Sequence, residues 1–326
     1  MVTMKAVTIA EYGSSDVLQV REIAKPQPKS GEVLVKVHAS TINDIDWALV
    51  RGKPYPYRLM FGVIKPKITI PGAEIAGVVE TVGEDISAFK KDQRVFGDIS
   101  MKGLGGWAEY VSVPATTLTP IPSTMNFQQA VALPHASLLA LQGLVTIGKI
   151  KKGERVLING AGGAVGITAL QLAKMYNCHV TGVDKDVKLS TLTSLGFDEV
   201  LDYEKVDFVD RGIKYDLILD TKTTFSSFRY PKVLKKEGRY VTVGGYLPKL
   251  IQIVFTKALI KKLTHKEIKI LSLKPNEGLD HICQLFDKRA VKPVLDNIYT
   301  LEETKLGLSR FGQAQHIGKI IVSITE

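Results

Sequence analysis

The stretch RVLINGAGGAVGITALQLAKM, residues 155–175, decides the fold. It opens with a short apolar run, turns at Gly160, Gly162 and Gly163, and continues with small and apolar residues suited to a helix. Glycines in such a turn let the backbone approach a pyrophosphate closely. The following helix directs unpaired N–H groups and the positive end of its dipole at the same point. The stretch therefore predicts a strand–turn–helix unit that binds a dinucleotide.

Strands and helices alternate beyond this unit. Strands are expected at HVTGVD (179–184), EVLDY (199–203), YDLILD (215–220), RYVTVGG (239–245) and EIKILSL (267–273), and helices at 186–195, 225–235 and 249–262. Apolar strands separated by helices form a parallel sheet that is covered on both faces. We therefore expect a Rossmann doubly wound parallel sheet over residues 121–263.

The N-terminal part follows a different pattern. GEVLVKVHAS (31–40), EIAGVVETVG (74–83) and EYVSV (109–113) alternate as strands do. Residues 51–71 contain four prolines and are expected to form a long ordered loop. These features predict a β-rich domain over residues 1–120. The tail, residues 264–326, carries a helix near 277–288 and a final strand KIIVSI, and we expect it to complete this first domain.

The composition restricts the class of protein. The chain has 326 residues, enough for two domains, and only two cysteines, so a reducing cytoplasm fits better than a secreted disulfide framework. It has no apolar run long enough to span a membrane and no secretory leader, so we expect no membrane partner. The net charge of +10 comes from scattered lysines, which indicates a solvated surface and argues against nucleic acid as the main partner.

Several stretches together resemble the zinc-free medium-chain dehydrogenase/reductases, in particular their quinone oxidoreductase-like branch. They are VHASTINDIDW (37–47), PGAEIAGVVETVG (71–83), KKGERVLINGAGGAVGITALQLAK (151–174), SLGFDEVLDY (194–203) and HIGKIIV (316–322). The resemblance implies a GroES-like substrate domain completed by the C-terminal tail, a Rossmann domain and a homodimer. It also implies hydride transfer from NAD(P)H to a small-molecule quinone or α,β-unsaturated carbonyl.

Zinc-dependent members of that family bind a catalytic zinc ion through three side chains. At the matching places this sequence has Asn43, Ala73 and His135, and residues 97–106 lack the cysteines of the family's structural zinc lobe. A catalytic zinc ion takes three protein ligands, and one nitrogen ligand is too few. We therefore expect no metal site.

Four side chains are predicted to serve the chemistry. The amide of Asn43 can both donate and accept a hydrogen bond to nicotinamide or substrate. Asp46 can orient substrate or cap a helix, and Tyr55, with its neighbour Tyr57, can stack on a planar ring or pack. His135 can supply the proton after hydride transfer or serve as a core histidine.

The predicted cofactor-binding residues surround the glycine turn and the ends of the sheet. They are Asn43, Ser137, Gly160, Gly162, Gly163, Ala164, Val165, Asp184, Lys185, Lys188, Tyr203, Val243, Gly244, Gly245, Gly318 and Lys319. Asp184 stands where a carboxylate accepts hydrogen bonds from the ribose of NAD. Lys185 and Lys188 stand where they can pair with the 2′-phosphate of NADP, so we predict a mild preference for NADP(H).

Two alternatives remain open on the sequence. The first is reduction of an enoyl thioester by the same hydride chemistry. The second is a non-catalytic member of the family that binds a nucleotide or RNA, which the net charge permits.

Overall fold

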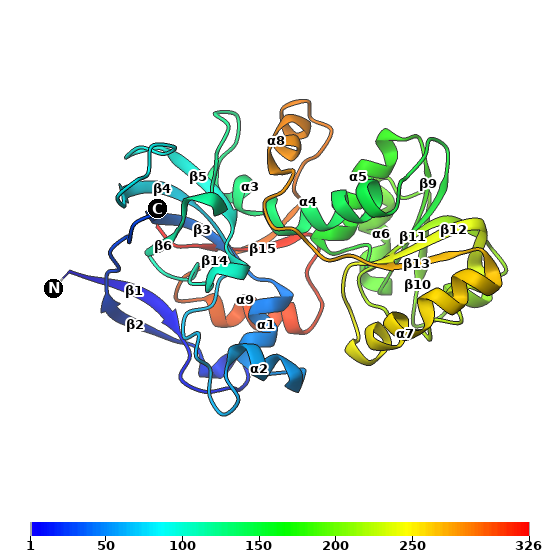
Figure 1. The fold of residues 1–326 in the computed structure, drawn as a ribbon, viewed down its shortest axis with the longest axis horizontal. Coiled ribbons are helices and arrows are strands. Elements are labelled where there is room, and N and C mark those ends of the chain that lie inside the picture. Colours follow the sequence, from blue (N-terminus) through cyan, green and yellow to red (C-terminus); the bar gives the residue numbers. More distant parts are fainter. Residues whose placement is uncertain (1, 326) are drawn as a thin grey trace. The chain divides into compact units, whose positions relative to one another are not determined.

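Six strands form one parallel sheet, as the glycine-rich stretch predicts (Figure 1). The protein is described by a computed structural model that covers residues 2–325. The strands are β8 (Arg155–Asn159), β9 (His179–Asp184), β10 (Glu199–Asp202), β11 (Tyr215–Asp220), β12 (Leu234–Thr242) and β13 (Glu267–Ile270). Their order is β10-β9-β8-β11-β12-β13, and every neighbouring pair is parallel. The Rossmann doubly wound sheet is confirmed, with its order reversing beside β8, where such sheets bind ligands.

Helices connect these strands, and one predicted helix is absent. The helices are α4 (Pro134–Leu141), α5 (Ala164–Met175), α6 (Asp186–Leu195) and α7 (Leu247–Thr264), with a π-helix at Gln142–Ile147. The helix expected at 225–235 is wrong. A 3-10 turn, Tyr230–Val233, stands there and leads directly into β12. Pro231 disfavours helical geometry at the residue before it, so an α-helix cannot run through this position undisturbed.

Antiparallel strands dominate the other part of the chain. They are β1 (Thr3–Thr8), β2 (Gln19–Ala24), β3 (Glu32–Thr41), β4 (Glu74–Val82), β5 (Arg94–Asp98), β6 (Tyr110–Pro114), β7 (Thr119–Pro120), β14 (Leu295–Thr300) and β15 (Lys319–Ser323). The main sheet runs β14-β15-β3-β4-β5-β7, with β6 also paired to β3. Its alternating valines and isoleucines, Val33, Val35, Val37 and Ile75 among them, are buried in one core. The β-rich domain is thus confirmed, and the C-terminal strand β15 joins it as expected.

Short helices accompany this sheet. They are α1 (Asp44–Arg51), α2 (Arg58–Phe61), α3 (Phe127–Val131), α8 (Leu279–Asp287) and α9 (Thr304–Gly312). The 3-10 turns elsewhere are Ser15–Val17, Tyr55–Tyr57, Ser100–Lys102, Ala115–Thr117 and Phe208–Asp210. No helix within residues 2–325 combines the length and apolar character needed to cross a membrane.

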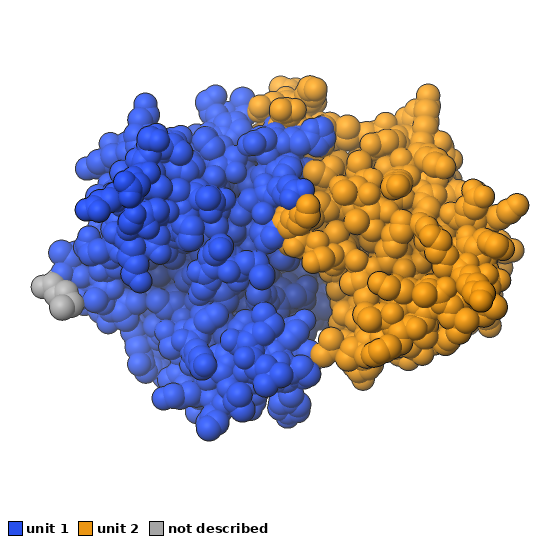
Figure 2. Space-filling model, viewed as in Figure 1, with its two compact units in different colours: residues 1–135, 275–283, 293–326 blue, residues 136–274, 284–292 orange. Residues whose placement is uncertain are grey.

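The chain divides into two compact units at places that differ from the predicted boundaries (Figure 2). Unit 1 comprises residues 1–135, 275–283 and 293–326, and unit 2 comprises 136–274 and 284–292. The predicted boundary at 263/264 lies too early, because β13 pairs with β12 in the parallel sheet. The predicted boundary at 120/121 is also too early, because α3 clusters with unit 1.

Candidate cofactor site and buried ionic cluster

The glycine turn follows β8 in unit 2, and three of its glycines are required by the fold itself. Gly160 has a left-handed φ of +87°. A Cβ at Gly162 would lie 2.8 Å from Lys188 Cδ, and one at Gly166 would lie 2.5 Å from the carbonyl oxygen of Gly160. These residues therefore let the turn close on itself and let α5 pack against it.

Two further glycines, Gly163 and Gly244, are required neither by backbone conformation nor by packing. Neither has a left-handed φ. A Cβ at Gly163 would meet nothing nearer than the Gly160 oxygen at 3.7 Å, and one at Gly244 would meet nothing within 4 Å. Every other glycine of ordinary φ in the described chain would bring its Cβ closer than 3.0 Å to another atom. Among the glycines of ordinary φ in residues 2–325, the fold therefore leaves open space only at Gly163 and Gly244.

That open space fits a dinucleotide. Gly163 follows β8 and Gly244 follows β12, so both lie beyond the carboxyl ends of strands in the parallel sheet. Gly163 also precedes α5, whose first-turn N–H groups, at Ala164 and Val165, have no acceptor within the helix. A pyrophosphate near Gly163 would meet these donors.

Asp184, at the end of β9, is already partly neutralised by the protein. Its Oδ2 accepts the Gly162 N–H at 2.7 Å, and its Oδ1 accepts the Lys185 N–H at 2.9 Å. The Lys188 ammonium lies 3.5 Å from Oδ1 and is almost fully buried. Burial lowers the pKa of Lys188, although the charge of Asp184 opposes that shift. The sequence predicts that Lys188 pairs with a 2′-phosphate, whereas in the structure it pairs with Asp184.

Sequence reasoning missed a cation beside the turn. Lys222 follows β11 and is exposed, and its Cε lies 3.2 Å from the position that a Cβ at Gly160 would take. Within residues 2–325 neither Lys222 nor Lys185 takes part in an ion pair, so both charges are available to a phosphate. The sequence could have indicated Lys222, because it follows β11 by two residues and the carboxyl ends of these parallel strands form the edge where ligands bind.

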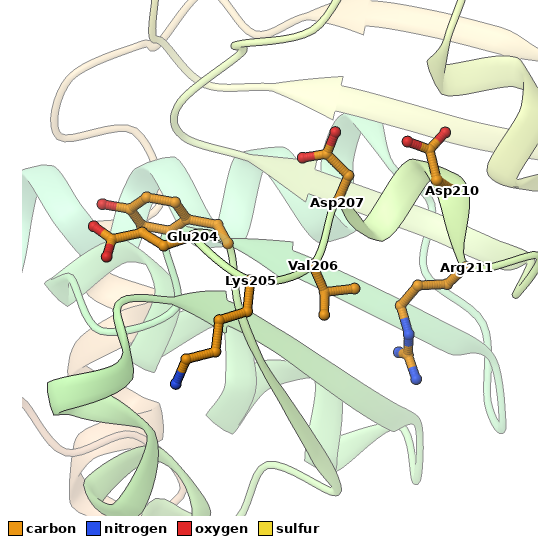
Figure 3. Close-up of a pocket in the computed structure, with 7 residues that line it drawn as sticks. Glu204, Lys205, Val206, Asp207, Asp210 and Arg211 are labelled. Atoms are coloured by element: carbon orange, nitrogen blue, oxygen red, sulfur yellow. The ribbon is translucent and has the colours of Figure 1, made fainter.

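Tyr203 is part of a shallow hollow formed by the loop after β10 (Figure 3). Its N–H donates to the carbonyl oxygen of Asp184 at 3.2 Å, so it lies beside the predicted ribose position. Most charged groups of the hollow are committed elsewhere: Arg211 pairs with Glu199, and Asp210 pairs with Arg229. Tyr203, through its contact with Asp184, links this loop to the predicted cofactor site.

A buried carboxylate fixes the loop that precedes Gly244. Asp220 is fully buried, and it accepts hydrogen bonds from Asn159 Nδ2 at 2.8 Å and from Tyr240 Oη at 2.9 Å. It also accepts the N–H groups of residues 222 and 223. The Thr223 hydroxyl then donates to the Gly244 carbonyl at 2.7 Å. Sequence reasoning did not find this network, which positions Gly244.

The other predicted cofactor residues are buried or make close backbone contacts. Ser137 is fully buried in α4, and the N–H of Val243 donates to the carbonyl of Asp220. Gly245 and Gly318 have left-handed φ, and a Cβ at either would lie 2.1 Å from a carbonyl oxygen. Val243 and Gly245 flank Gly244 in the chain and so border its open backbone.

Unit 1 contains a separate cluster of buried polar side chains around Glu74, which directly follows Ala73, the second of the three positions that match zinc ligands in the family. Glu74 Oε2 accepts hydrogen bonds from Thr41 Oγ1 at 2.6 Å and from Asn43 Nδ2 at 2.9 Å. It also lies 2.5 Å from the Lys319 ammonium, and both side chains of this pair are buried. Lys319 donates in addition to Asn43 Oδ1. The structure thus joins Asn43 and Lys319, two predicted site residues, through a carboxylate that was not predicted.

His135 extends this cluster to a second buried carboxylate. The backbone N–H of His135 donates to Glu74 Oε1 at 2.7 Å, and the ring Nδ1 lies 2.7 Å from Asp98 Oδ2. Asp98 is fully buried, whereas the His135 side chain is 24% exposed. Burial disfavours the imidazolium, but the hydrogen bond and charge of Asp98 outweigh it and raise the pKa of His135. The contact with Asp98 at Nδ1 therefore fixes the orientation of the imidazole ring. The other ring nitrogen, Nε2, has no hydrogen-bond partner within the described residues.

Asp46 holds backbone groups beside this cluster, and Tyr55 lies on the surface of unit 1. Asp46 Oδ2 accepts the Asn43 N–H at 2.9 Å and its Oδ1 accepts the Gly72 N–H at 2.8 Å, so it caps α1 and holds the turn at Gly72. Burial raises the pKa of Asp46 to about 7. Tyr55 is 64% exposed beside Arg58, and Tyr57 packs edge-on against Phe61.

The donor set does not fit a zinc ion. Asn43 uses both its amide nitrogen and its amide oxygen within the cluster, Ala73 offers no donor, and His135 Nδ1 is held by Asp98. No group of three or more His, Cys, Asp or Glu side chains in residues 2–325 is arranged to hold a metal ion.

Comparisons with known proteins agree with this architecture. A family model described as "Alcohol dehydrogenase GroES-like domain" matches residues 29–123, and one described as "Zinc-binding dehydrogenase" matches residues 195–322. A chloroplastic quinone-oxidoreductase homolog of Spinacia oleracea is 30% identical over 98% of both chains. A 2-methylene-furan-3-one reductase of Solanum lycopersicum is 34% identical over 80% of this chain and 68% of its own.

Two further similarities support the same assignment. The human quinone oxidoreductase is 32% identical over 74% of this chain and 73% of its own. The solved quinone oxidoreductase of Coxiella burnetii superposes with a TM-score of 0.87 over 99% of this chain and 100% of its own, at 24% identity, which supports the fold. The β-rich domain is thereby confirmed as GroES-like. The chain belongs to the quinone oxidoreductase-like branch of the medium-chain dehydrogenase/reductases, and it is an oxidoreductase.

Proposed function

We propose that this enzyme uses NAD(P)H to reduce a small quinone or an α,β-unsaturated carbonyl, without zinc. The observation that carries the proposal is the hydrogen-bonded set of Asn43, Glu74 and Lys319 at the place where zinc-dependent relatives bind their metal. A conjugated acceptor needs no Lewis acid, because the negative charge from the hydride spreads to a distant oxygen. The names of the quinone oxidoreductase and enone reductase relatives support the same substrate class.

The cofactor, when bound, supplies the hydride, and the chain supplies binding and orientation. The N-terminus of α5 and the space at Gly163 would hold the pyrophosphate. Tyr203 and Asp184 lie at the position for the adenosine ribose, and the open backbone at Gly244 lies where the nicotinamide half would pass. Asp220 keeps that backbone in place through Thr223.

The proton that completes the reduction would come from His135. Asp98 holds Nδ1 and favours the imidazolium, which leaves the Nε2–H as the donor to the oxygen that gains charge. Asn43, whose amide is engaged on three sides, would keep the cluster in place rather than contact the substrate directly.

Turnover measurements test this function. Purified enzyme should oxidise NADPH with a quinone and with a conjugated enone, and a strong chelator should not lower the rate. Gly163→Val should raise the KM for NADPH at least about tenfold, because its branched side chain enters the open space at the pyrophosphate position. The thermal midpoint should change little, since the nearest atom to a Cβ there is the Gly160 oxygen, at an ordinary contact distance of 3.7 Å.

Other outcomes would redirect the assignment. Turnover with an enoyl thioester but not with free enones would favour the thioester alternative. Salt-dependent RNA binding without any turnover would favour the non-catalytic alternative. An unchanged KM for NADPH in Gly163→Val would mean that the glycine turn is structural only.

The cofactor preference should favour NADPH and should depend on Lys185 and Lys222. The charge of Asp184 is offset by Lys188 and two N–H donors, so it repels a 2′-phosphate weakly, while the two unpaired lysines attract one. Exposed charge pairs contribute about 0.2–1 kcal/mol each. Lys185→Glu combined with Lys222→Glu should therefore lower the NADPH-to-NADH ratio of kcat/KM about tenfold.

A charge-matched variant controls for the loss of net charge. Lys90→Glu with Lys91→Glu makes the same change in unit 1, where both lysines are exposed, and should leave the ratio unaltered. A wild-type preference for NADH that neither double variant moves would show that Asp184 alone determines the choice.

A homodimer is the assembly that fits unit 2. Strand β13 ends the parallel sheet with an unpaired edge, and α7, which packs along it, exposes Ile251, Phe255 and Leu263. A second copy that continues the sheet would cover both features. A cytoplasmic location is consistent with the low cysteine count, Cys178 and Cys283, both of which are buried.

A further inference from the structure

The segment of residues 51–67, here called the apolar–basic loop, has an unusual composition for a surface. It contains Arg51, Lys53, Arg58, Lys65 and Lys67, and no acidic residue occurs between Asp46 and Glu74. None of these five cations takes part in an ion pair within residues 2–325. The loop therefore presents positive charge that no carboxylate of the protein offsets.

Apolar side chains project from the same loop. Leu59 is 81% exposed and Ile64 is 90% exposed, and Met60 and Val63 are each 64% exposed. They lie on α2 and on the turn that follows it, at the margin of unit 1 (Figure 1). Soluble proteins normally bury such residues or scatter them singly, so a contiguous group marks a surface that contacts something else.

The base of the loop is firmly attached to unit 1. Phe61, between the exposed residues, is buried in the core that also contains Trp107. The Tyr12 hydroxyl donates to the Gly62 carbonyl at 2.5 Å, and the Lys67 N–H donates to the Phe61 carbonyl at 2.6 Å. These contacts fix the base of the loop, and they hold the four apolar side chains in an exposed position.

We propose that the apolar–basic loop docks the enzyme on the surface of an anionic lipid bilayer. A membrane interface offers negative headgroups above an apolar boundary, which complements a loop that carries both cations and exposed apolar side chains. Insertion to the depth of the headgroups would bury Leu59, Met60, Val63 and Ile64, while Lys53, Lys65 and Lys67 reach phosphates. This mode of attachment needs no spanning helix, but it departs from the sequence expectation of no membrane partner.

The docking is separate from the proposed reaction, because none of the loop side chains in the test is placed in the cofactor site or the ionic cluster. It would bring an oxidoreductase to acceptors that dissolve in lipid. Cosedimentation of the full chain with vesicles tests it. Phosphatidylcholine vesicles serve as the neutral surface, and vesicles with about 30% phosphatidylglycerol serve as the anionic one.

The wild type should bind the anionic vesicles at least about tenfold more tightly than the neutral ones, and added salt should weaken this binding. Leu59→Asp with Ile64→Asp should reduce binding at least about tenfold by removing the apolar tip. Lys65→Glu with Lys67→Glu should remove the preference for anionic lipid. Lys90→Glu with Lys91→Glu, the same charge change elsewhere in unit 1, should bind within about twofold of wild type. All variants should retain NADPH turnover in solution.

Three results would overturn the proposal. Wild type that binds neither vesicle type has no docking surface for lipid. Equal losses in the loop variants and in the Lys90/Lys91 variant would assign the binding to net charge alone. Loop variants that change the molecular mass in solution but bind vesicles as wild type does would assign the loop to a second copy of the chain.

Discussion

Replacing His135 with Gln is expected to lower kcat for quinone or enone reduction about 100-fold, because a positioned acid typically contributes 10²–10⁴-fold. The KM for NADPH should stay close to that of wild type, since His135 lies in unit 1 and not at the glycine turn. Gln keeps a polar side chain at this partly buried position, so the fold should persist. Steady-state rates and a thermal melt measure both effects.

The pH dependence gives a second and sharper readout. His135 donates its proton from the imidazolium form, which exists below its pKa, and Asp98 raises that pKa above the ordinary value of 6.5. Wild-type kcat should therefore fall as the pH rises through the raised pKa. Asp98→Asn removes the charge but keeps the shape, so the fall should move to lower pH, and His135→Gln should abolish it. A kcat that His135→Gln leaves intact at every pH would assign the proton to solvent.

The fold could be predicted far more completely than the ionic cluster. The glycine turn and the apolar strands after it determine the parallel sheet, because each is a local signal that tertiary contacts reinforce. The helix predicted over 225–235 failed where a proline and a neighbouring strand overrode the pattern. The unit boundaries failed because β13 reads like any other strand and only its pairing with β12 assigns it to unit 2.

The cluster around Glu74 could not be read from the sequence in the same way. Glu74, Asp98 and Lys319 lie far apart along the chain, on β4, β5 and β15, and antiparallel pairing brings these strands into one sheet. A lone Glu at the start of a strand carries no local signal of burial. Resemblance to the family pointed to Asn43 and His135 because they stand at metal positions, but not to the carboxylates that engage them.

The contrast between Gly163 and Lys188 shows a second limit. Both were assigned to the cofactor from their positions near the turn, and the open space around Gly163 supports that assignment. Lys188 is one helical turn after Asp184, and this spacing equally permits an i, i+4 ion pair. Only the three-dimensional structure shows whether such a lysine pairs with a carboxylate of the protein or is available to bind a phosphate.

Lys319→Met is expected to lower the free energy of unfolding by about 3–5 kcal/mol, because it leaves the buried carboxylate of Glu74 without its counter-ion. Chemical denaturation with an unchanged m-value measures this loss. The exposed pair of Lys5 and Glu302 provides the control, since its side chains are more than half exposed. Lys5→Met should cost less than about 1 kcal/mol.

A double variant separates the ion pair from a direct role of Lys319 at the cofactor. Glu74→Gln added to Lys319→Met removes both charges, and without Lys319 the Asn43 amide is free to turn its oxygen toward the new Gln amide. The double variant should recover at least about half of the lost stability, because buried pairs can be replaced by neutral groups at little cost. The affinity of folded Lys319→Met for NADPH should stay within about twofold of wild type, since the stabilising partner of Lys319 is Glu74. Normal stability combined with a tenfold weaker affinity would instead make Lys319 a cofactor ligand, as the sequence first suggested, and would remove the ion pair from the account of the fold.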